Sequence, residues 1–302
     1  MAIETGNRPL AGILWMFLTG LTFVGVTAIV RHLGTELPAA ESAFIRFLYG
    51  IAFLSPAILS VLRKGLPAGA GRLILVRGVL HTGAVILWFY AMAHIPMAEV
   101  TAIGYLNPVV VTAGGMFLFR EKLTATRVAA ILVALVGALV ILRPGFRVVE
   151  TGHVAQLGAA LGFGLSYLIA KRLSAMLPAA ALVALLSVTV TIGLAPFALA
   201  AWVTPTPLQV FWLGGVAVFA TAGHYCMARA FAAAPLTVTQ PVIFLQLVWA
   251  VLVGYFLFDE VADPLVIAGG GIIIAAILTL TVKEARDRRQ SERAAIETTQ
   301  PA

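Results

Sequence analysis

The chain has 302 residues, of which 61% are hydrophobic and only 11% charged, and its formal net charge is +7. An average soluble domain is about 25% charged, so a soluble fold of this length could not bury so much apolar surface. Its basic residues lie between hydrophobic stretches and near the C-terminus rather than among aromatic residues, which excludes a nucleic-acid-binding surface. The composition predicts an integral membrane protein that contacts the lipid bilayer.

A membrane-spanning helix needs about 20 mostly apolar residues. Divided at its charges and Pro/Gly clusters, the chain contains ten such stretches, which leave no soluble domain. The predicted spans are 10–30, 43–62, 73–93, 97–119, 125–142, 152–170, 179–202, 208–230, 236–258 and 264–282. The residues after them, 284–302, are predicted to form a basic cytoplasmic tail without regular structure.

Lys and Arg residues predict the orientation, because positively charged loops stay in the cytoplasm. With both termini cytoplasmic, the outer loops hold only Arg31, Arg143 and Arg147. The even number of spans agrees with this orientation. We therefore expect a multi-pass protein of the bacterial inner membrane.

The two halves of the chain match each other at a shift of about 140 residues. The matched pairs include Phe23 with Phe163, Pro56 with Pro196, and Glu121 with Glu260. This predicts two five-helix repeats, residues 1–145 and 146–283. Because each repeat has an odd number of spans, the second enters the membrane upside down. Inverted repeats favour a carrier that works by alternating access over a passive channel.

Polar groups within the bilayer are costly, so each is a candidate functional group, with helix packing as the alternative. On the third span, Arg77, His81 and Trp88 share one helix face because they are four and seven residues apart. Arg77 lies about one turn from the cytoplasmic end and could reach the headgroups. His81 lies deeper, where its imidazole could donate and accept hydrogen bonds.

Other polar groups fall on the fourth, sixth, eighth and ninth spans. Asn107 and Gln246 occupy equivalent positions in the two halves, and amides bind polar ligands without the cost of a buried charge. The predicted substrate-binding residues are His81, Trp88, Tyr105, Asn107, Tyr167, His224 and Gln246. The predicted gating or structural residues are Arg46, Arg77, Glu99 and Gln240.

Enzymatic signatures are missing from the sequence. It contains no Gly-rich phosphate loop beside a strand, no ligand cluster at metal spacing and no nucleophile motif, so we expect no catalytic residue, metal or cofactor. Glu121 and Glu260 cannot act as an acid pair, because inversion places them on opposite sides of the membrane. They are expected to tie helix ends to their neighbours.

Several motifs resemble the EamA family of the drug/metabolite transporter superfamily, and the resemblance covers nearly the whole chain. They are Arg46-Phe47, Arg77-Gly78, Phe89-Tyr90-Ala91-Met92, Phe119-Arg120-Glu121-Lys122, Arg143-Pro144-Gly145 and Phe258-Asp259-Glu260. The resemblance implies ten helices, cytoplasmic termini, and a central cavity lined by the first four and the sixth to ninth helices.

The aromatic, amide and imidazole groups are similar to what the amino-acid exporter branch typified by YddG would need. We therefore expect export of amino acids, aromatic and neutral ones included, or of related metabolites. His81, Asn107 and Gln246 would hold the polar head of the solute, and Trp88, Tyr105 and Tyr167 would contact its side chain.

Two alternatives to amino-acid export stay open. One is uptake of a cofactor-like metabolite such as S-adenosylmethionine or riboflavin. The other is a non-transporting scaffold or lipid-handling protein, which would need no converging polar cavity. Efflux of cationic drugs is less favoured, because the deep acidic group, Glu99, lies close to the outer end. The glycine-rich face of the tenth span offers a surface for a homodimer.

Overall fold

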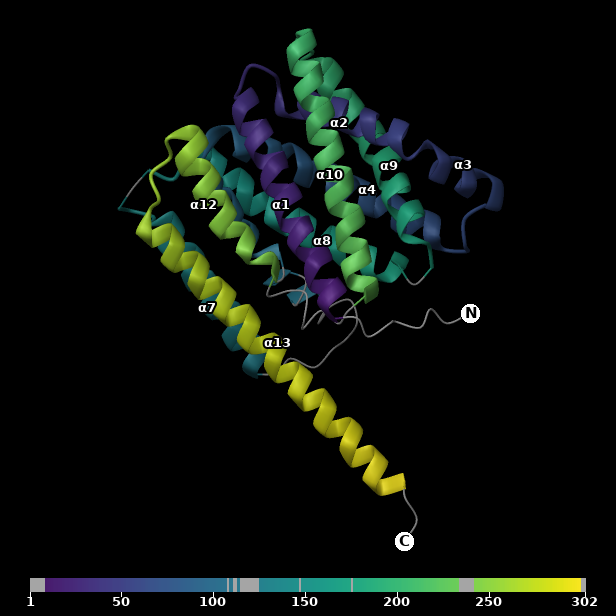
Figure 1. The fold of residues 1–302 in the computed structure, drawn as a ribbon, viewed down its shortest axis with the longest axis vertical. Helices are drawn as coiled ribbons and strands as arrows, with labels where there is room; N and C mark the ends of the chain where they lie inside the picture. The colour runs from purple at the N-terminus through teal and green to yellow at the C-terminus, as the bar shows by residue number, and fades with distance from the viewer. Residues whose placement is uncertain are drawn as a thin grey trace.

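The computed structural model describes residues 9–107, 109–110, 113–114, 125–146, 148–174, 176–233 and 242–299. These residues form eleven helices (Figure 1). They are α1 (Pro9–Leu33), α2 (Ala39–Phe53), α3 (Ser55–Lys64), α4 (Ala70–His94), α5 (Met97–Gly104), α7 (Ala125–Leu142), α8 (Thr151–Ser174), α9 (Ala179–Ala200), α10 (Pro207–Ala233), α12 (Leu245–Phe258) and α13 (Pro264–Thr299).

The helices account for the ten predicted spans, since α2 and α3 together form the second span and α5 begins the fourth. Within the described residues, five helices are long and apolar enough to cross a membrane, or six when α2 and α3 count as one bent span. Three helices, α7, α12 and α13, contain shorter apolar stretches. The chain is an all-α multi-pass membrane protein, as its composition predicts.

Helix packing follows the internal repeat. In the second half, α8 is the counterpart of α1, and α10 is the counterpart of α4. The most extensive contacts join α1 to α10 and α4 to α8. These pairs are equivalent, because replacing each helix of one pair by its counterpart in the other repeat gives the other pair. Two other pairs, α2 with α9 and α7 with α13, each join a helix to its own counterpart, and α5 and α12, which belong to equivalent spans, also contact each other. A twofold relation between inverted five-helix repeats produces this pattern.

The second span differs from the single helix predicted over 43–62. It is divided into α2 and α3, which are bent by 67° at Leu54. Pro56 lies in the first turn of α3, where a missing N–H needs no partner, but it could not continue α2 without removing a helical hydrogen bond. Because α2 begins at residue 39, Arg46 lies two turns into it rather than in the first turn.

The C-terminal segment also differs from its prediction. Helix α13 continues to Thr299 instead of ending near residue 283. Figure 1 shows its C-terminal part projecting beyond the other helices, while its first part lies beside α7. The segment is rich in Ala, Glu and Arg, which have high intrinsic helix propensity, so it can be helical without a packing partner.

Two glycines bring α7 and α13 close together. A Cβ atom added to Gly269 would lie 2.6 Å from both the Gly137 carbonyl oxygen and Ile141 Cγ1. We expect Gly269→Ala to lower the free energy of unfolding by about 1–3 kcal/mol, because the backbone oxygen cannot move aside without shifting a helix. Thermal unfolding in detergent would measure this loss.

The matched control is Gly271→Ala, two residues along the same helix. A Cβ atom at Gly271 would meet nothing within 4 Å. The unfolding free energy of this variant should stay within about 1 kcal/mol of the wild type, since within a single chain alanine only raises helix propensity there. Equal stability of the two variants would contradict the close approach of α7 and α13.

Candidate transport site

The two ends of the bundle carry different charges. We call one the acidic end, where α1, α4, α7 and α12 end and α2, α5, α8, α10 and α13 begin. Its described acidic residues are Glu36, Glu41, Glu99, Glu150, Asp259, Glu260 and Asp263. We call the other the basic end, where α4 begins and α3, α8 and α10 end. Polar contacts between the two repeats are concentrated at the acidic end.

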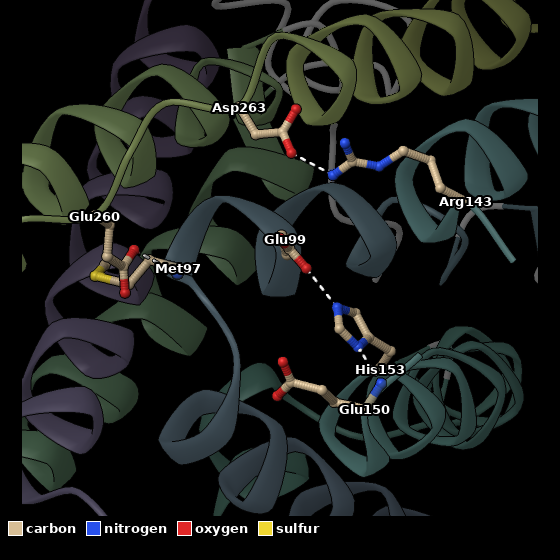
Figure 2. Close-up of polar contacts among 7 residues, drawn as sticks. All are labelled: Met97, Glu99, Arg143, Glu150, His153, Glu260 and Asp263. Carbon is tan, nitrogen blue, oxygen red and sulfur yellow. Dashed lines mark hydrogen bonds and ion pairs between the residues drawn. The ribbon is translucent and has the colours of Figure 1, made fainter. Parts of the chain in front are cut away.

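Glu99 and His153 form a buried pair across the repeats at the acidic end (Figure 2). Glu99 Oε2 lies 2.5 Å from His153 Nε2, and the two residues are 5% and 2% exposed. The Glu150 backbone N–H donates to His153 Nδ1 over 3.0 Å. An acceptor nitrogen carries no proton, so the imidazole is neutral and its Nε2–H donates to the carboxylate.

Glu260 forms a second connection between the repeats. Its carboxylate lies 3.0 Å from Arg31 Nε and accepts a hydrogen bond of 2.9 Å from the Met97 backbone N–H. Arg31 also donates to the Ala93 carbonyl oxygen. Glu260 thus ties the end of α12 to α1 and to the start of α5, which confirms the role expected for it from the sequence.

Asp263 forms a third connection, to Arg143 of the first repeat (Figure 2). It also caps α13: Pro264 follows it as the first helical residue, and the Leu265 N–H donates to Asp263 Oδ1 over 2.8 Å. Partial burial raises the pKa of the Asp263 carboxyl, but hydrogen bonds from Leu265 and Arg143 outweigh it and hold the pKa below its ordinary value.

The lowered pKa of Asp263 predicts a pH effect. A carboxyl with a lowered folded-state pKa stabilises the fold above its unfolded-state pKa of about 4 and loses that contribution as pH falls through the folded-state value. Asp263→Asn keeps a capping side chain but removes the charge, so it should be less stable than the wild type near pH 7 by at most about 1 kcal/mol. Thermal unfolding in detergent from pH 7 to pH 3 should show the difference shrinking, and a constant difference would contradict the assignment.

A connected aromatic cluster lies in the interior between the repeats. The Phe163 ring centroid on α8 lies 4.9 Å from His81, 5.7 Å from Trp88 and 6.0 Å from Tyr167. On α1, Phe23 contacts Trp88 and His224 at 6.4 and 5.3 Å. We call these six residues, Phe23, His81, Trp88, Phe163, Tyr167 and His224, the central cluster.

The imidazoles of the central cluster are anchored by hydrogen bonds. His81 Nδ1 lies 3.0 Å from the Ser166 hydroxyl on α8. His224 Nδ1 donates to the Ala220 carbonyl oxygen over 2.8 Å, because a carbonyl oxygen can only accept. The Nε2 atom of neutral His224 is therefore an acceptor, and the cluster combines aromatic faces with hydrogen-bonding nitrogens.

Two arginines border the central cluster. Arg46 is 8% exposed, and its Cζ lies 3.8 Å from the centre of the Phe47 ring, which in turn contacts His81. It lines a narrow cavity with His224, Ser187 and others, whose volume of about 10 Å³ holds about one water molecule. Arg77 is 6% exposed and donates to the Leu182 carbonyl oxygen on α9. The structure is therefore closed around these groups.

Three other predicted site residues, Tyr105, Asn107 and Gln246, lie outside the central cluster. The Tyr105 hydroxyl donates to the Phe244 carbonyl oxygen and accepts from the Leu247 N–H, so it braces the start of α12. Asn107 lies against Gly164 of α8, and Gln246 lies against Gly20 of α1. Gln240 lies outside the described residues.

Sequence reasoning missed several members of these networks. Phe23 and Phe163 were matched as equivalent residues but were not assigned to the site, although their equivalence was a usable signal. His153 and Gln156 were also missed. They are one turn apart, and Gln156 Nε2 donates to the Val100 carbonyl oxygen. This spacing of polar residues in an apolar span could have identified them.

Comparisons with known proteins agree with this fold. The model of the EamA-like transporter family matches residues 10–143 and 150–282. The Pseudopaline exporter CntI of Pseudomonas aeruginosa is 28% identical over 280 residues, which cover 90% of this chain and 96% of that protein. The S-adenosylmethionine uptake transporter of Rickettsia prowazekii is 26% identical over 285 residues, covering 91% and 94%.

A further relative and a solved structure extend these comparisons. The Riboflavin transporter of Vibrio cholerae is 27% identical over 290 residues, covering 94% of this chain and 97% of that protein. A crystal structure matches with a TM-score of 0.57 at 15% identity, over 94% of this chain and 98% of that chain, and it supports the fold alone. The relatives are named as transporters of small molecules, which confirms a transporter rather than an enzyme.

Proposed function

The chain belongs to the EamA-like transporter family, as its motifs predicted, and we propose that it exports amino acids or closely related metabolites by alternating access. The observation that carries this proposal is the central cluster, in which the predicted residues His81, Trp88, Tyr167 and His224 meet between the two repeats. Aromatic faces suit the side chain of an aromatic or neutral amino acid, and imidazole nitrogens suit its polar head. Asn107 and Gln246 supply further amide groups when the site opens.

Uptake of a cofactor-like metabolite is the second candidate. Two relatives are named for S-adenosylmethionine uptake and riboflavin transport, and both solutes contain flat ring systems that an aromatic cluster would accept. Counterflow with labelled riboflavin and S-adenosylmethionine beside amino acids separates the candidates. A signal confined to the two cofactors would replace amino-acid export with cofactor uptake.

The proposed orientation places the acidic end outside a bacterial inner membrane and both termini in the cytoplasm. The excess of Lys and Arg on the opposite side supports it. The contacts of Glu99 with His153, Arg31 with Glu260 and Arg143 with Asp263 then form an outer gate, because each joins the two repeats. Arg77, bound to α9 nearer the basic end, belongs to the inner side of the pathway.

The proposed domain organisation is a first repeat over 1–145, a second over 146–283 and a basic segment over 284–302. A homodimer through α13 belongs to the same proposal. Of the three glycines on that helix, Gly269 and Gly270 already contact other helices of this chain, whereas Gly271 faces open space. The dimer surface would therefore centre on Gly271.

The test of the central site is the double variant His81→Leu/Gln246→Leu in proteoliposomes. Each lost hydrogen-bond partner of a bound polar solute costs about 1–2 kcal/mol, so counterflow of a transported amino acid should fall roughly tenfold or more. The matched control, His32→Leu/Gln290→Leu, makes the same chemical changes at exposed positions and should leave the flux unchanged. Wild-type flux in the His81/Gln246 variant would refute the site.

A further inference from the structure

Among the described residues, the buried arginines of the interior have no carboxylate beside them. Arg46 and Arg77 are 8% and 6% exposed, and neither forms an ion pair with a described carboxylate. From Ser42 to Phe258 the sequence contains only three acidic residues, Glu99, Glu121 and Glu150. Glu99 and Glu150 lie at the acidic end, in the contacts of Figure 2.

Arg46 is the arginine that shares a cavity with a residue of the central cluster, His224. It is the eighth residue of α2, about 10 Å along the helix from its start at the acidic end, and the bend at Leu54 follows. Its guanidinium stacks on Phe47 and lines the same cavity as His224. Arg77 lines a different cavity and donates through Nη1 to the Leu182 carbonyl oxygen of α9, while its Nε has no partner among the described groups. Arg46 and His224 therefore line the same small cavity beside the central cluster.

A buried charge without a partner is strongly unfavourable, whereas a guanidinium binds a carboxylate through two parallel hydrogen bonds. The neighbouring groups cannot supply negative charge. The described neighbours of Arg46 in the cavity are aromatic, hydroxyl, imidazole and aliphatic side chains. His81, which contacts the Phe47 ring, has the Ser166 hydroxyl as its hydrogen-bond partner and brings no carboxylate to the cavity. An anion bound in this cavity would offset the charge of Arg46.

We infer that Arg46 binds a carboxylate of the transported solute, while the apolar part of the solute lies against the central cluster, so that the site selects carboxylates over amides and cations. The inference rests on the proposed function and deepens it by naming the chemical group that is recognised. An anionic or zwitterionic solute satisfies it, and a cation without a carboxylate does not.

The test uses four compounds with one side chain and different charges: N-acetylphenylalanine, phenylalanine, N-acetylphenylalaninamide and phenylalaninamide. Binding to the purified full-length protein is measured as ligand-dependent thermal stabilisation, which needs no transport. Hydrogen bonds between charged groups are worth about 1.5–3 kcal/mol, so the two carboxylates should bind roughly tenfold to a hundredfold more tightly than the two amides. Equal binding of phenylalaninamide, or no stabilisation by either carboxylate, would overturn the inference.

Variants assign this preference to Arg46. Arg46→Gln should remove the preference for carboxylates while leaving the weak binding of the neutral amide unchanged, and Arg46→Lys should restore part of it because the charge remains. The control, Arg63→Gln, changes an exposed arginine at the end of α3 and should keep the wild-type preference. If Arg46→Gln does not fold, the test rests on the binding of the four compounds to the wild type and to Arg46→Lys. A preference that survives Arg46→Gln would overturn the inference.

Two further results separate this inference from the proposed function. Phenyl phosphate is the probe for the other common anion, and stabilisation by it without stabilisation by carboxylates would overturn the carboxylate assignment. If carboxylates bind through Arg46 but no amino acid exchanges in counterflow, the inference holds and amino-acid export fails. If amino acids exchange but charge at Arg46 does not affect their binding, export holds and the inference fails.

Discussion

Replacing His153 by leucine is expected to lower the free energy of unfolding by about 3–5 kcal/mol, because it leaves the buried Glu99 carboxylate without its imidazole donor. The two side chains are among the least exposed polar groups of the acidic end. The loss has a second source, since the Glu150 backbone N–H also loses its acceptor, His153 Nδ1. Unfolding of the purified protein in detergent would measure the change.

A second substitution tests whether the buried charge causes the loss. Glu99→Gln removes the charge of the carboxylate and nearly keeps its shape, so Glu99→Gln/His153→Leu should be more stable than His153→Leu alone by about 1–3 kcal/mol. The exposed His32 is the control position, and His32→Leu should stay near the wild type. A double variant no more stable than His153→Leu would show that packing, and not charge, explains the loss.

The fold could be predicted from the sequence largely because a bilayer leaves few choices. Apolar stretches of sufficient length must be helices, and an odd number of them per repeat must invert the second copy. The matched residues of the halves identify the repeat, but the packing of helices on their counterparts is seen in the structure. The bend at Leu54 was not predicted from Pro56. The residue that matches Pro56 in the second half, Pro196, lies inside α9, which continues past it to Ala200, so a proline at this position does not by itself divide the span.

The candidate site could be predicted only in part. The cost of polar groups in lipid identified His81 and His224, and the structure places both in the central cluster. The same argument could not assign Phe23 or Phe163, because apolar rings are expected in every span. Nor could it distinguish a polar group that faces a cavity from one that braces a helix, since both avoid lipid. Tyr105 is the residue for which this distinction matters most.

Tyr105→Phe is expected to lower the free energy of unfolding by about 2–4 kcal/mol, because the Phe244 carbonyl oxygen and the Leu247 N–H both lose a buried partner. The ring itself is kept, so its edge contact with Phe244 at 5.1 Å remains and no cavity forms. The effect should therefore arise from the hydroxyl alone. It would be seen as a lower unfolding temperature in detergent.

Tyr167→Phe is the matched control, since phenylalanine retains the stacking of the ring on Phe163 and no hydrogen bond of the hydroxyl to another described residue is lost. This variant should stay within about 1 kcal/mol of the wild type. Because Tyr105 joins the end of α5 to the start of α12, its loss should loosen the contact between equivalent helices of the two repeats. If Tyr105→Phe instead keeps full stability and only weakens solute binding, the hydroxyl faces the solute, and the brace between α5 and α12 is wrong.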